Sequence, residues 1–326
     1  MKQRLFLTGI AGLAFGLCFA GNLCGSEWRV VGVSVADVRK KPGTATRAGL
    51  HDQDQETQLI YGEKVAVLKV ESGWAKIQAV EQQEYTHRRF WEGYPGWVKA
   101  SCLLPPRKED KTDTVVVAKW ADLWKDAYKA KPLGIKLPMG SWITAKDMGG
   151  QLWQVRLADG TVAWMDYPAA VSKQSLSGLN TRQKRAALIA SAQKLIGDAY
   201  YWGGRSPQDD SQKNQITGVD CSGLINLSFR TIGMAVARDA HEQYLKARPV
   251  KQLQPGDLIF LSEPANPKRI VHVMLYAGNG ELLEGPGTGE TIRRITVAKR
   301  LGKPMEQLKP NDVIGGQTLF FGSLLE

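Results

Sequence analysis

The chain contains two side chains whose chemistry suits acyl transfer, the thiol of Cys221 and the imidazole of His272. A cysteine nucleophile needs a base that takes up its proton and a third group that fixes the tautomer of the base. Asp220 precedes the cysteine and apolar residues at roughly helical spacing follow it, which predicts an amphipathic helix capped by Asp220. Cys221 would then lie at the positive end of the helix dipole, which favours the thiolate. The alternative is that Cys221 is a small buried apolar residue without chemistry.

His272 is the candidate base because it interrupts an apolar predicted strand at 270–276, where an imidazole is costly unless it is paired or faces a cleft. Glu284, in the next predicted strand, is the candidate orienting group. A two-residue loop at Asn279-Gly280 would place Glu284 on the opposite face of the hairpin from His272, and this role would fail. An odd-length loop centred on Gly278 would place the two side chains directly opposite each other. We therefore predict the odd-length loop and a hydrogen bond from the His272 ring to Glu284; the alternative is a structural histidine.

The four cysteines and four histidines show no spacing typical of a metal site. We therefore expect no structural zinc, and no organic cofactor is implied. Cys18 and Cys24 lie in the N-terminal segment, which leaves Cys102 and Cys221 for the folded part. A disulfide between these two would inactivate the thiol, so Cys221 is expected to be free.

Three domains are predicted to position these residues. Short apolar runs separated by turns fill residues 26–105, as in a small all-β barrel, and a more divergent copy of the pattern fills residues 114–172. A polar, proline-led linker joins the two copies. Tryptophans recur in both copies, and we expect most of them in the barrel cores. Helical periodicity begins after Ser172 and strands follow it, which predicts a third domain over residues 178–326.

The N-terminus has the order of a secretory signal peptide over residues 1–25, because Lys2 and Arg4 precede an apolar run too short for a comfortable membrane span. Leu23-Cys24 offers a lipoprotein-like cysteine, so membrane attachment through an N-terminal lipid stays open. The formal net charge of +11 is dispersed and suits anionic cell-wall polymers or membrane surfaces. Nucleic acid is not an expected partner without a binding motif. We expect an exported monomer of the periplasm or cell envelope.

The third domain resembles the NlpC-type cell-wall cysteine peptidases in five motifs that occur in the same order, over about residues 183–300. These motifs are Tyr200-Tyr201-Trp202-Gly203-Gly204, Asp220-Cys221-Ser222-Gly223-Leu224, Arg238-Asp239, Gln252 to Leu258, and His272-Val273. The resemblance implies a papain-like α+β core that hydrolyses peptidoglycan stem peptides, with Cys221 as nucleophile and His272 as base. It also implies a third polar residue at position 284, where many relatives have histidine. Glu284 is thus a departure; a carboxylate can still orient an imidazole, but it leaves the pH optimum open.

The first of the two preceding segments resembles a bacterial SH3-like domain in three short pieces, Ala36 to Gly43, Gly73 to Ile77 and Gly96 to Val98, and the second resembles a more divergent copy of it. The fold class expected for the whole chain is therefore α+β, with a papain-like NlpC-type domain preceded by two small all-β SH3-like barrels. This combination resembles the γ-D-glutamyl-L-diamino acid endopeptidases that act on stem peptides with a free N-terminal L-alanine.

Four substrate-binding residues follow from this second resemblance. Asp239 would bind the ammonium group, Tyr94 would reach into the cleft from the first barrel, and Ser222 and Tyr200 would line the pocket. Each residue also has a purely structural alternative. Asp239 would be a helix cap, Tyr94 a packed turn residue, Ser222 a first-turn hydroxyl and Tyr200 a core aromatic.

The expected reaction is hydrolysis of the bond between γ-D-glutamate and diaminopimelate or lysine in muropeptide fragments, through an acyl-enzyme. Two other functions compete with it: an amidase or acyltransferase on another envelope substrate, and a wall-binding scaffold with an inactive peptidase domain. An amine pocket closed by a barrel argues against a glycan-linked substrate, and the intact pair of Cys221 and His272 argues against the scaffold. The polar insert 208–217 has no assigned role.

Overall fold

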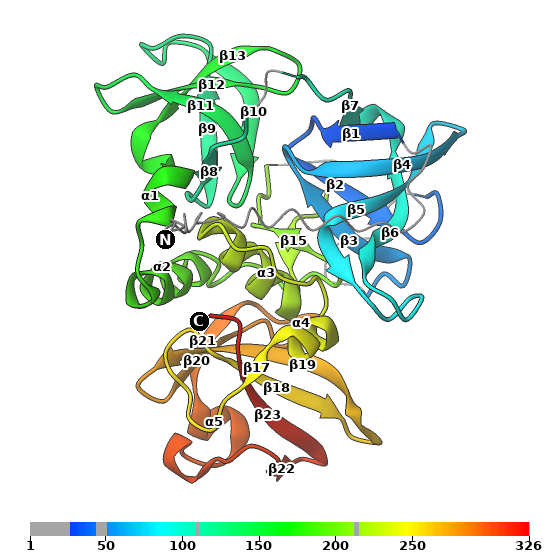
Figure 1. Ribbon diagram of the computed structural model, residues 1–326, viewed down its shortest axis with the longest axis vertical. Coiled ribbons are helices and arrows are strands. Elements are labelled where there is room, and N and C mark those ends of the chain that lie inside the picture. The colour runs from blue at the N-terminus through cyan, green and yellow to red at the C-terminus, as the bar shows by residue number, and fades with distance from the viewer. Residues whose placement is uncertain (1–26, 44–50, 109–110, 212–214, 326) are drawn as a thin grey trace, which may run out of the picture.

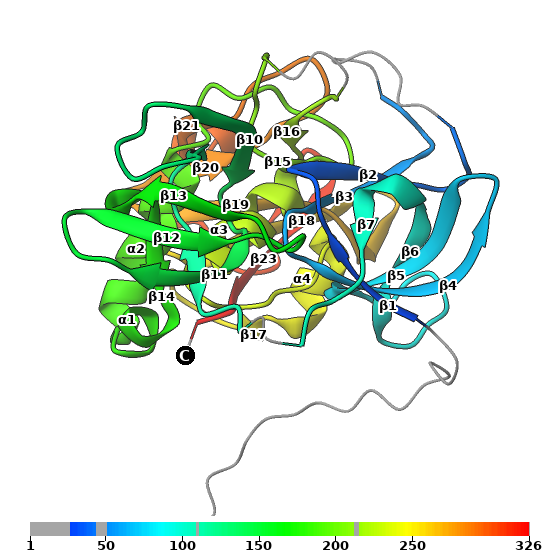
Figure 2. The same ribbon diagram turned by 90° about the horizontal axis from the view of Figure 1, so that it is seen from above.

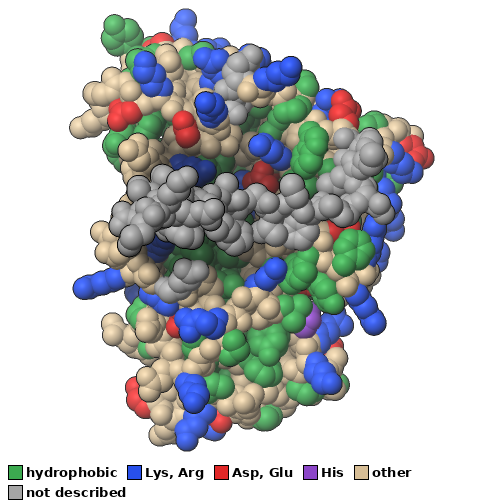
Figure 3. All heavy atoms as spheres, in the orientation of Figure 1, with side chains coloured by type: hydrophobic (Ala, Val, Ile, Leu, Met, Phe, Trp, Pro, Cys, Tyr) green, Lys and Arg blue, Asp and Glu red, His purple; other side chains and the backbone are tan. Residues whose placement is uncertain are grey.

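The computed structural model describes residues 27–43, 51–108, 111–211 and 215–325. The expected signal segment 1–25, with Cys18 and Cys24, lies outside the described residues. Among the helices that are described, none is both long and apolar enough to cross a membrane. On the face of the molecule shown in Figure 3, the lysine and arginine side chains are spread over all parts without forming one patch.

An antiparallel sheet of seven strands forms the first β domain, with the order β3-β2-β6-β5-β4-β1-β7. Its strands are β1 (Glu27–Val31), β2 (Val35–Arg39), β3 (Gln55–Ile60), β4 (Lys64–Glu71), β5 (Trp74–Glu84), β6 (Glu92–Lys99) and β7 (Leu103–Leu104), and the short helix η1 (Ala100–Cys102) precedes β7. In β6 every second residue is buried, which is the period of a strand with one face on a core. This alternation fixes which side of β6 faces the core.

The second β domain repeats this topology, because its strand order, β10-β9-β13-β12-β11-β8-β14, equals the first with each number raised by seven. Its elements are β8 (Thr114–Val116), β9 (Trp120–Trp124), β10 (Pro132–Pro138), β11 (Trp142–Asp147), β12 (Leu152–Arg156), β13 (Val162–Asp166), η2 (Tyr167–Ala169) and β14 (Ala170–Ser172). The expectation that most tryptophans lie in the cores is wrong. Of the nine tryptophans in the two β domains, Trp153 is buried, seven are partly buried, and Trp28 is exposed by 45%.

A third antiparallel sheet follows, with the order β17-β23-β18-β19-β20-β21 and with β22 paired to β23. Its strands are β17 (Arg248–Pro249), β18 (Leu258–Glu263), β19 (Asn266–Gly278), β20 (Glu281–Glu284), β21 (Arg293–Thr296), β22 (Val313–Ile314) and β23 (Gln317–Ser323). The remaining elements are α1 (Lys173–Ser177), α2 (Thr181–Gln193), β15 (Arg205–Ser206), β16 (Gly218–Val219), α3 (Cys221–Thr231), α4 (Ala240–Lys246), α5 (Val297–Leu301) and η3 (Met305–Gln307). One face of β18 and β19 packs with α2 and α3, and the other face packs with α5.

Helix α3 lies between this sheet and the two β domains, which sit side by side on its far side (Figure 1, Figure 2). All eleven residues of α3 are buried, so the expected amphipathic helix is wrong. Ile60 of the first β domain and Met139 of the second belong to the same apolar core as the helix. The face of α3 that would meet solvent in an isolated domain is therefore covered by the β domains.

The insert 208–217, as far as it is described, bridges both β domains. The Trp120 indole N–H donates to the Gln208 carbonyl oxygen at 3.1 Å, and the Gln58 amide donates to the carbonyl oxygen of Ile216 at 2.7 Å. These two bonds join the insert to the second and the first β domain respectively. The insert therefore helps to hold the three parts in one arrangement.

Candidate active site

Cys221 is the first residue of α3, and Asp220 caps the helix as the sequence predicts. The Gly223 backbone N–H donates to Asp220 Oδ1 at 2.6 Å, which satisfies one of the free amides of the first turn. A side chain at Gly223 would collide with the carbonyl oxygen of Gly204, so the glycine lets the loop before β15 approach the helix. Together these contacts fix the direction of the helix end that carries the cysteine.

The Cys221 thiol is a free and almost completely buried group, with 7% relative exposure. Burial, followed by repulsion from the Asp220 carboxylate, raises the pKa of this thiol to about 12, although backbone N–H groups of Ser222 and Val273 act in the opposite direction. The expected thiolate at the helix end is therefore not favoured in the resting enzyme. Desolvation of the buried thiol outweighs the effect of the helix dipole, so the thiol proton must be removed during the reaction.

His272 lies on β19, next to the residue whose amide contacts the sulfur. Its Nε2 is 3.2 Å from Oε2 of Glu284, so the predicted contact of the two side chains is present. Within the described residues no hydrogen bond joins the Cys221 thiol directly to the imidazole. Catalytic hydrogen bonds often tighten only when substrate is bound.

The hairpin that brings Glu284 to His272 differs from the predicted one. The turn is the two-residue loop Asn279-Gly280, with φ values of 53° and 71°, so the expected odd-length loop is wrong. A β-bulge between Tyr276 and Gly278 adds one residue to β19 and restores the parity. The register beyond the bulge pairs Leu275 with Leu283, which makes His272 and Glu284 diagonal neighbours on one face instead of direct partners.

Glu284 is fully buried, and two arginines join His272 as its donors. Arg293 donates to Oε1 at 2.8 Å and Arg300 donates to Oε2 at 2.8 Å. Burial alone would raise the pKa of Glu284, but the hydrogen bonds from His272, Arg300 and Arg293 lower it to about 2. Glu284 is therefore a carboxylate that only accepts. Neither arginine was identified from the sequence.

Tyr94 and Asp239 meet across the boundary between the first β domain and the third sheet's domain. The Tyr94 hydroxyl donates to Asp239 Oδ2 at 3.0 Å, and Tyr94 lies on β6 with only 4% exposure. Asp239 is the N-cap residue of α4, but its side chain makes no cap hydrogen bond, which argues against the helix-cap alternative. Tyr94 belongs to a strand, which argues against a turn residue.

The surroundings of Asp239 are strongly charged. Burial raises the pKa of the Asp239 carboxyl to about 7, and the Arg238 guanidinium, 3.6 Å away, opposes the rise. The side chain keeps 41% of its surface exposed, so solvent screening keeps the pKa below what full burial would produce.

On the other side of Tyr94, the His87 ring packs edge-on at 5.3 Å between centroids. Hydrogen bonds to Glu56 and Glu84 raise the pKa of His87 to about 10. His87, to which the sequence analysis assigned no role, thus packs against Tyr94.

Ser222 and Tyr200 are both buried close to Cys221. The Ser222 hydroxyl donates to Asp220 Oδ1 at 3.2 Å and accepts from Arg238 Nη1 at 3.0 Å. Tyr200 belongs to the apolar core around α3, and burial, followed by the charges of Cys221 and Asp220, raises the pKa of its phenol. The hydroxyl of Ser222 therefore holds Arg238, and Tyr200 forms a wall beside the thiol.

Arg238 is a site residue to which the sequence assigned no role. It is fully buried and donates to Thr57 Oγ1 at 2.7 Å and to Asp220 Oδ2 at 2.8 Å. It thus ties the first β domain to the cap of the cysteine helix. Its position directly before Asp239 within a family motif was a signal that could have identified it.

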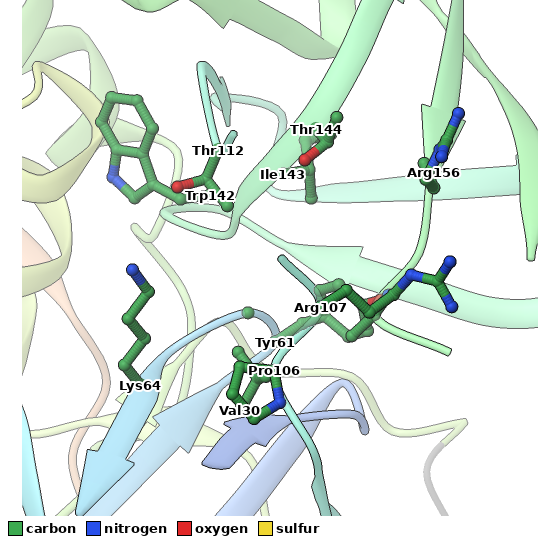
Figure 4. A pocket seen from close by; sticks show the side chains of 12 residues that line it. Val30, Tyr61, Lys64, Pro106, Arg107, Thr112, Trp142, Ile143, Thr144 and Arg156 are labelled. Carbon is green, nitrogen blue, oxygen red and sulfur yellow. The ribbon is translucent and has the colours of Figure 1, made fainter. Parts of the chain in front are cut away.

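A separate cavity of about 100 Å³ lies between the two β domains (Figure 4). Its lining includes Lys64, Trp142 and Arg156, and none of the predicted catalytic or substrate-binding residues. Across the part of the chain that the structure describes, no group of three or more His, Cys, Asp or Glu side chains could hold a metal ion.

Comparisons with known proteins identify relatives of the third domain and of the whole arrangement. The sequence model of the NlpC/P60 family matches residues 197–306. A gamma-D-glutamyl-L-lysine dipeptidyl-peptidase of Bacillus subtilis (strain 168) is 27% identical over 250 residues, which cover 76% of this chain and 77% of the relative. The peptidoglycan endopeptidase RipB of Mycobacterium tuberculosis (strain ATCC 25618 / H37Rv) is 36% identical over 127 residues, covering 37% of this chain and 51% of RipB.

The solved structure of an NlpC/P60 family protein from Bacillus cereus ATCC 10987 has the same overall fold. It superposes with a TM-score of 0.69 at 21% identity and covers 83% of this chain and 94% of that structure. The shared fold thus includes more than the region matched by the family.

Proposed function

We propose that this hydrolase cleaves stem peptides between γ-D-glutamate and the diamino acid. Residues 197–306 match the NlpC/P60 family, and the relatives include a gamma-D-glutamyl-L-lysine dipeptidyl-peptidase and a peptidoglycan endopeptidase. The substrates would be muropeptide fragments with a free N-terminal L-alanine, in the cell envelope, to which the expected signal segment would direct the protein. The bond named for the Bacillus subtilis relative, γ-D-glutamyl-L-lysine, supports the choice of bond.

The reaction begins with proton transfer from Cys221 to His272. The Glu284 carboxylate accepts a hydrogen bond from Nε2 of His272 and cannot donate one. It therefore keeps the ring hydrogen on Nε2 and leaves Nδ1 free to take the thiol proton. The sulfur then attacks the γ-carbonyl carbon of D-glutamate, and the first-turn amide of Cys221 is placed to donate to the developing oxyanion. The imidazolium protonates the departing diamino acid, and water hydrolyses the thioester.

Selectivity for a free amine rests on the pair of Tyr94 and Asp239. An ammonium group needs a carboxylate, and a substrate that lacks the charge leaves the buried polar groups unpaired, which penalises its binding. The hydrogen bond of 3.0 Å that joins these side chains across two domains carries this proposal. The first β domain, which we take to be SH3-like like the second, would close the groove and exclude substrates whose alanine is bonded to sugar.

Substituting Asp239 tests the proposal. Asp239→Asn is expected to lower kcat/KM for L-Ala-γ-D-Glu-diaminopimelate by roughly 10–100-fold, since a hydrogen bond between charged groups is worth about 1.5–3 kcal/mol. Cleavage of the same peptide with N-acetylated alanine should remain at the low level of the wild type. Tyr94→Phe, which removes only a hydroxyl, should give a smaller loss. Equal cleavage of both peptides by the wild type, measured by mass spectrometry, would contradict the amine pocket.

The raised pKa of Asp239 predicts a pH dependence for ligand binding. A bound ammonium stabilises the carboxylate, so the affinity falls up to tenfold per pH unit below a pKa of about 7, in the range where the peptide amine, with an ordinary pKa of about 8, stays protonated. Calorimetry with the Cys221→Ala variant would measure binding of the uncleaved peptide between about pH 5 and 7.5. The additional Asp239→Asn substitution should make the affinity both lower and nearly independent of pH. A flat profile with Asp239 intact would contradict this prediction.

A further inference from the structure

The contacts of Glu284 are more extensive than those of a group that only orients a histidine. Arg293 is its cross-strand partner on β21 and reaches Oε1 through both Nε, at 3.0 Å, and Nη2, at 2.8 Å. Arg300 reaches both carboxylate oxygens from α5, at 3.1 and 2.8 Å. A single buried carboxylate is thus held by two guanidinium groups and one imidazole.

The two arginines differ in their other contacts. Arg293 also lies 3.8 Å from the exposed Glu290, whereas Glu284 is the only acid that pairs with Arg300 in the described part of the chain. The exposed fractions of the side chains are 37% for Arg293 and 25% for Arg300. Both guanidinium groups therefore reach Glu284 from the surface. Replacing either arginine would not remove a fully buried positive charge.

The charge balance around His272 follows from this arrangement. An isolated carboxylate at hydrogen-bond distance stabilises the imidazolium form of His272, so the ring releases its proton less readily. Two guanidinium groups that contact the same carboxylate act in the opposite direction, because each carries a full positive charge. Further ionisable groups lie on the elements around the pair: Cys221 beside the Val273 amide of β19, His241, whose Nδ1 accepts from the Ile270 N–H of β19, and Glu290 beside Arg293.

We propose that Arg293 and Arg300 are positioning residues for the peptidase reaction, because they fix the Glu284 carboxylate against His272 and offset its charge. The inference rests on the proposed function, in which His272 must both accept and release a proton. The arginines keep Glu284 in one rotamer as an acceptor, so the ring stays oriented with its hydrogen on Nε2. They also allow the imidazolium to protonate the leaving amine more readily than it would beside an unpaired carboxylate.

Arg300→Gln tests the electrostatic part of this proposal. Removing one positive charge at this distance should raise the pKa of His272 by about 0.5–1 unit after solvent screening. NMR titration of the isotope-labelled imidazole measures this shift, and the pH dependence of Cys221 alkylation by iodoacetamide provides a second readout. Arg300→Lys keeps the charge and should largely restore the wild-type value. Neither readout needs a substrate, so an error in the assigned bond would not affect them.

Arg294→Gln is the matched control, because Arg294 directly follows Arg293 on β21 and pairs with Glu281 at 3.1 Å instead of Glu284. It removes the same charge from β21 and should leave the His272 titration unchanged. Arg293→Gln is the second variant if Arg300→Gln does not fold, and it should shift the titration in the same upward direction. An unchanged titration in the folded variant, or an equal shift in Arg294→Gln, would overturn the proposal.

Discussion

Cys221→Ala is expected to reduce hydrolysis of the free-amine stem peptide by about 10⁴-fold or more, because the acyl-enzyme cannot form without the sulfur. The fold should persist, since the change removes one buried atom at the end of a helix that is held by the Asp220 cap and by its core. Circular dichroism and binding of the uncleaved peptide would verify this. Activity is measured by mass spectrometry of the released diamino acid.

Cys102→Ala provides the matched control for this experiment. Cys102 is the other free thiol of the described chain; it lies in the first β domain, and burial raises its pKa as well. Its loss should leave activity within about twofold of the wild type, because it belongs to η1 and not to α3 or β19, which carry the nucleophile and the base. A thiol-directed probe should accordingly label Cys221 in the Cys102→Ala protein, and bound substrate should protect Cys221 from this labelling.

The nucleophile and the base are expected to act as one unit. His272→Ala alone should cost nearly as much activity as Cys221→Ala, and the double variant should lose little more than either single variant. Multiplicative losses would show that the two side chains act independently. That result, or substantial activity of Cys221→Ala, would contradict a mechanism through the thiol and the imidazole.

The local features of the site were predictable because they depend on neighbouring residues. The sequence predicts the cap of α3 because Asp220 stands three residues before the free amide of Gly223. It predicts the strand that carries His272 because apolar residues surround this histidine. The repeated β pattern likewise appears in the sequence, and the two sheets have the same strand order.

Features that depend on distant segments were not predictable. The bulge after Tyr276 changes the parity of the hairpin without any distinctive residue, so counting from the turn gave the wrong register. The complete burial of α3 requires Ile60 and Met139 from the β domains, and this burial, not the helix dipole, determines the pKa of Cys221. The sequence pattern of one helix does not show which of its faces other domains will cover.

Glu63 shows the same limitation and leads to the largest stability effect that we expect. It is fully buried in the first β domain and receives two hydrogen bonds from Arg205, at 2.7 and 3.0 Å, while Arg230 of α3 lies 3.6 Å away. Arg230 also donates to the Gly140 carbonyl oxygen of the second β domain at 2.7 Å. One buried carboxylate thus holds the junction of all three parts of the molecule.

Glu63→Gln should destabilise the folded arrangement by about 3–5 kcal/mol, because it leaves the fully buried Arg205 without its counter-charge, while Arg230 keeps its ion pair with Glu81. The chain has several domains, so denaturation monitored by tryptophan fluorescence should be combined with hydrogen exchange at each domain rather than reduced to a single transition. Exchange should increase first at the boundary between the first β domain and α3.

Separation at that boundary would also move Tyr94 away from Asp239, so Glu63→Gln should weaken the preference for a free N-terminal amine while the Cys221 nucleophile remains intact. Glu71→Gln is the matched control, since Glu71 forms an exposed ion pair with Lys69 in the same β domain, and its loss should leave the stability nearly unchanged. If Glu63→Gln destabilised the protein but kept full amine selectivity, the position of Tyr94 would not depend on this junction. The first β domain would then have to be held against the groove by other contacts, such as the bond from Arg238 to Thr57.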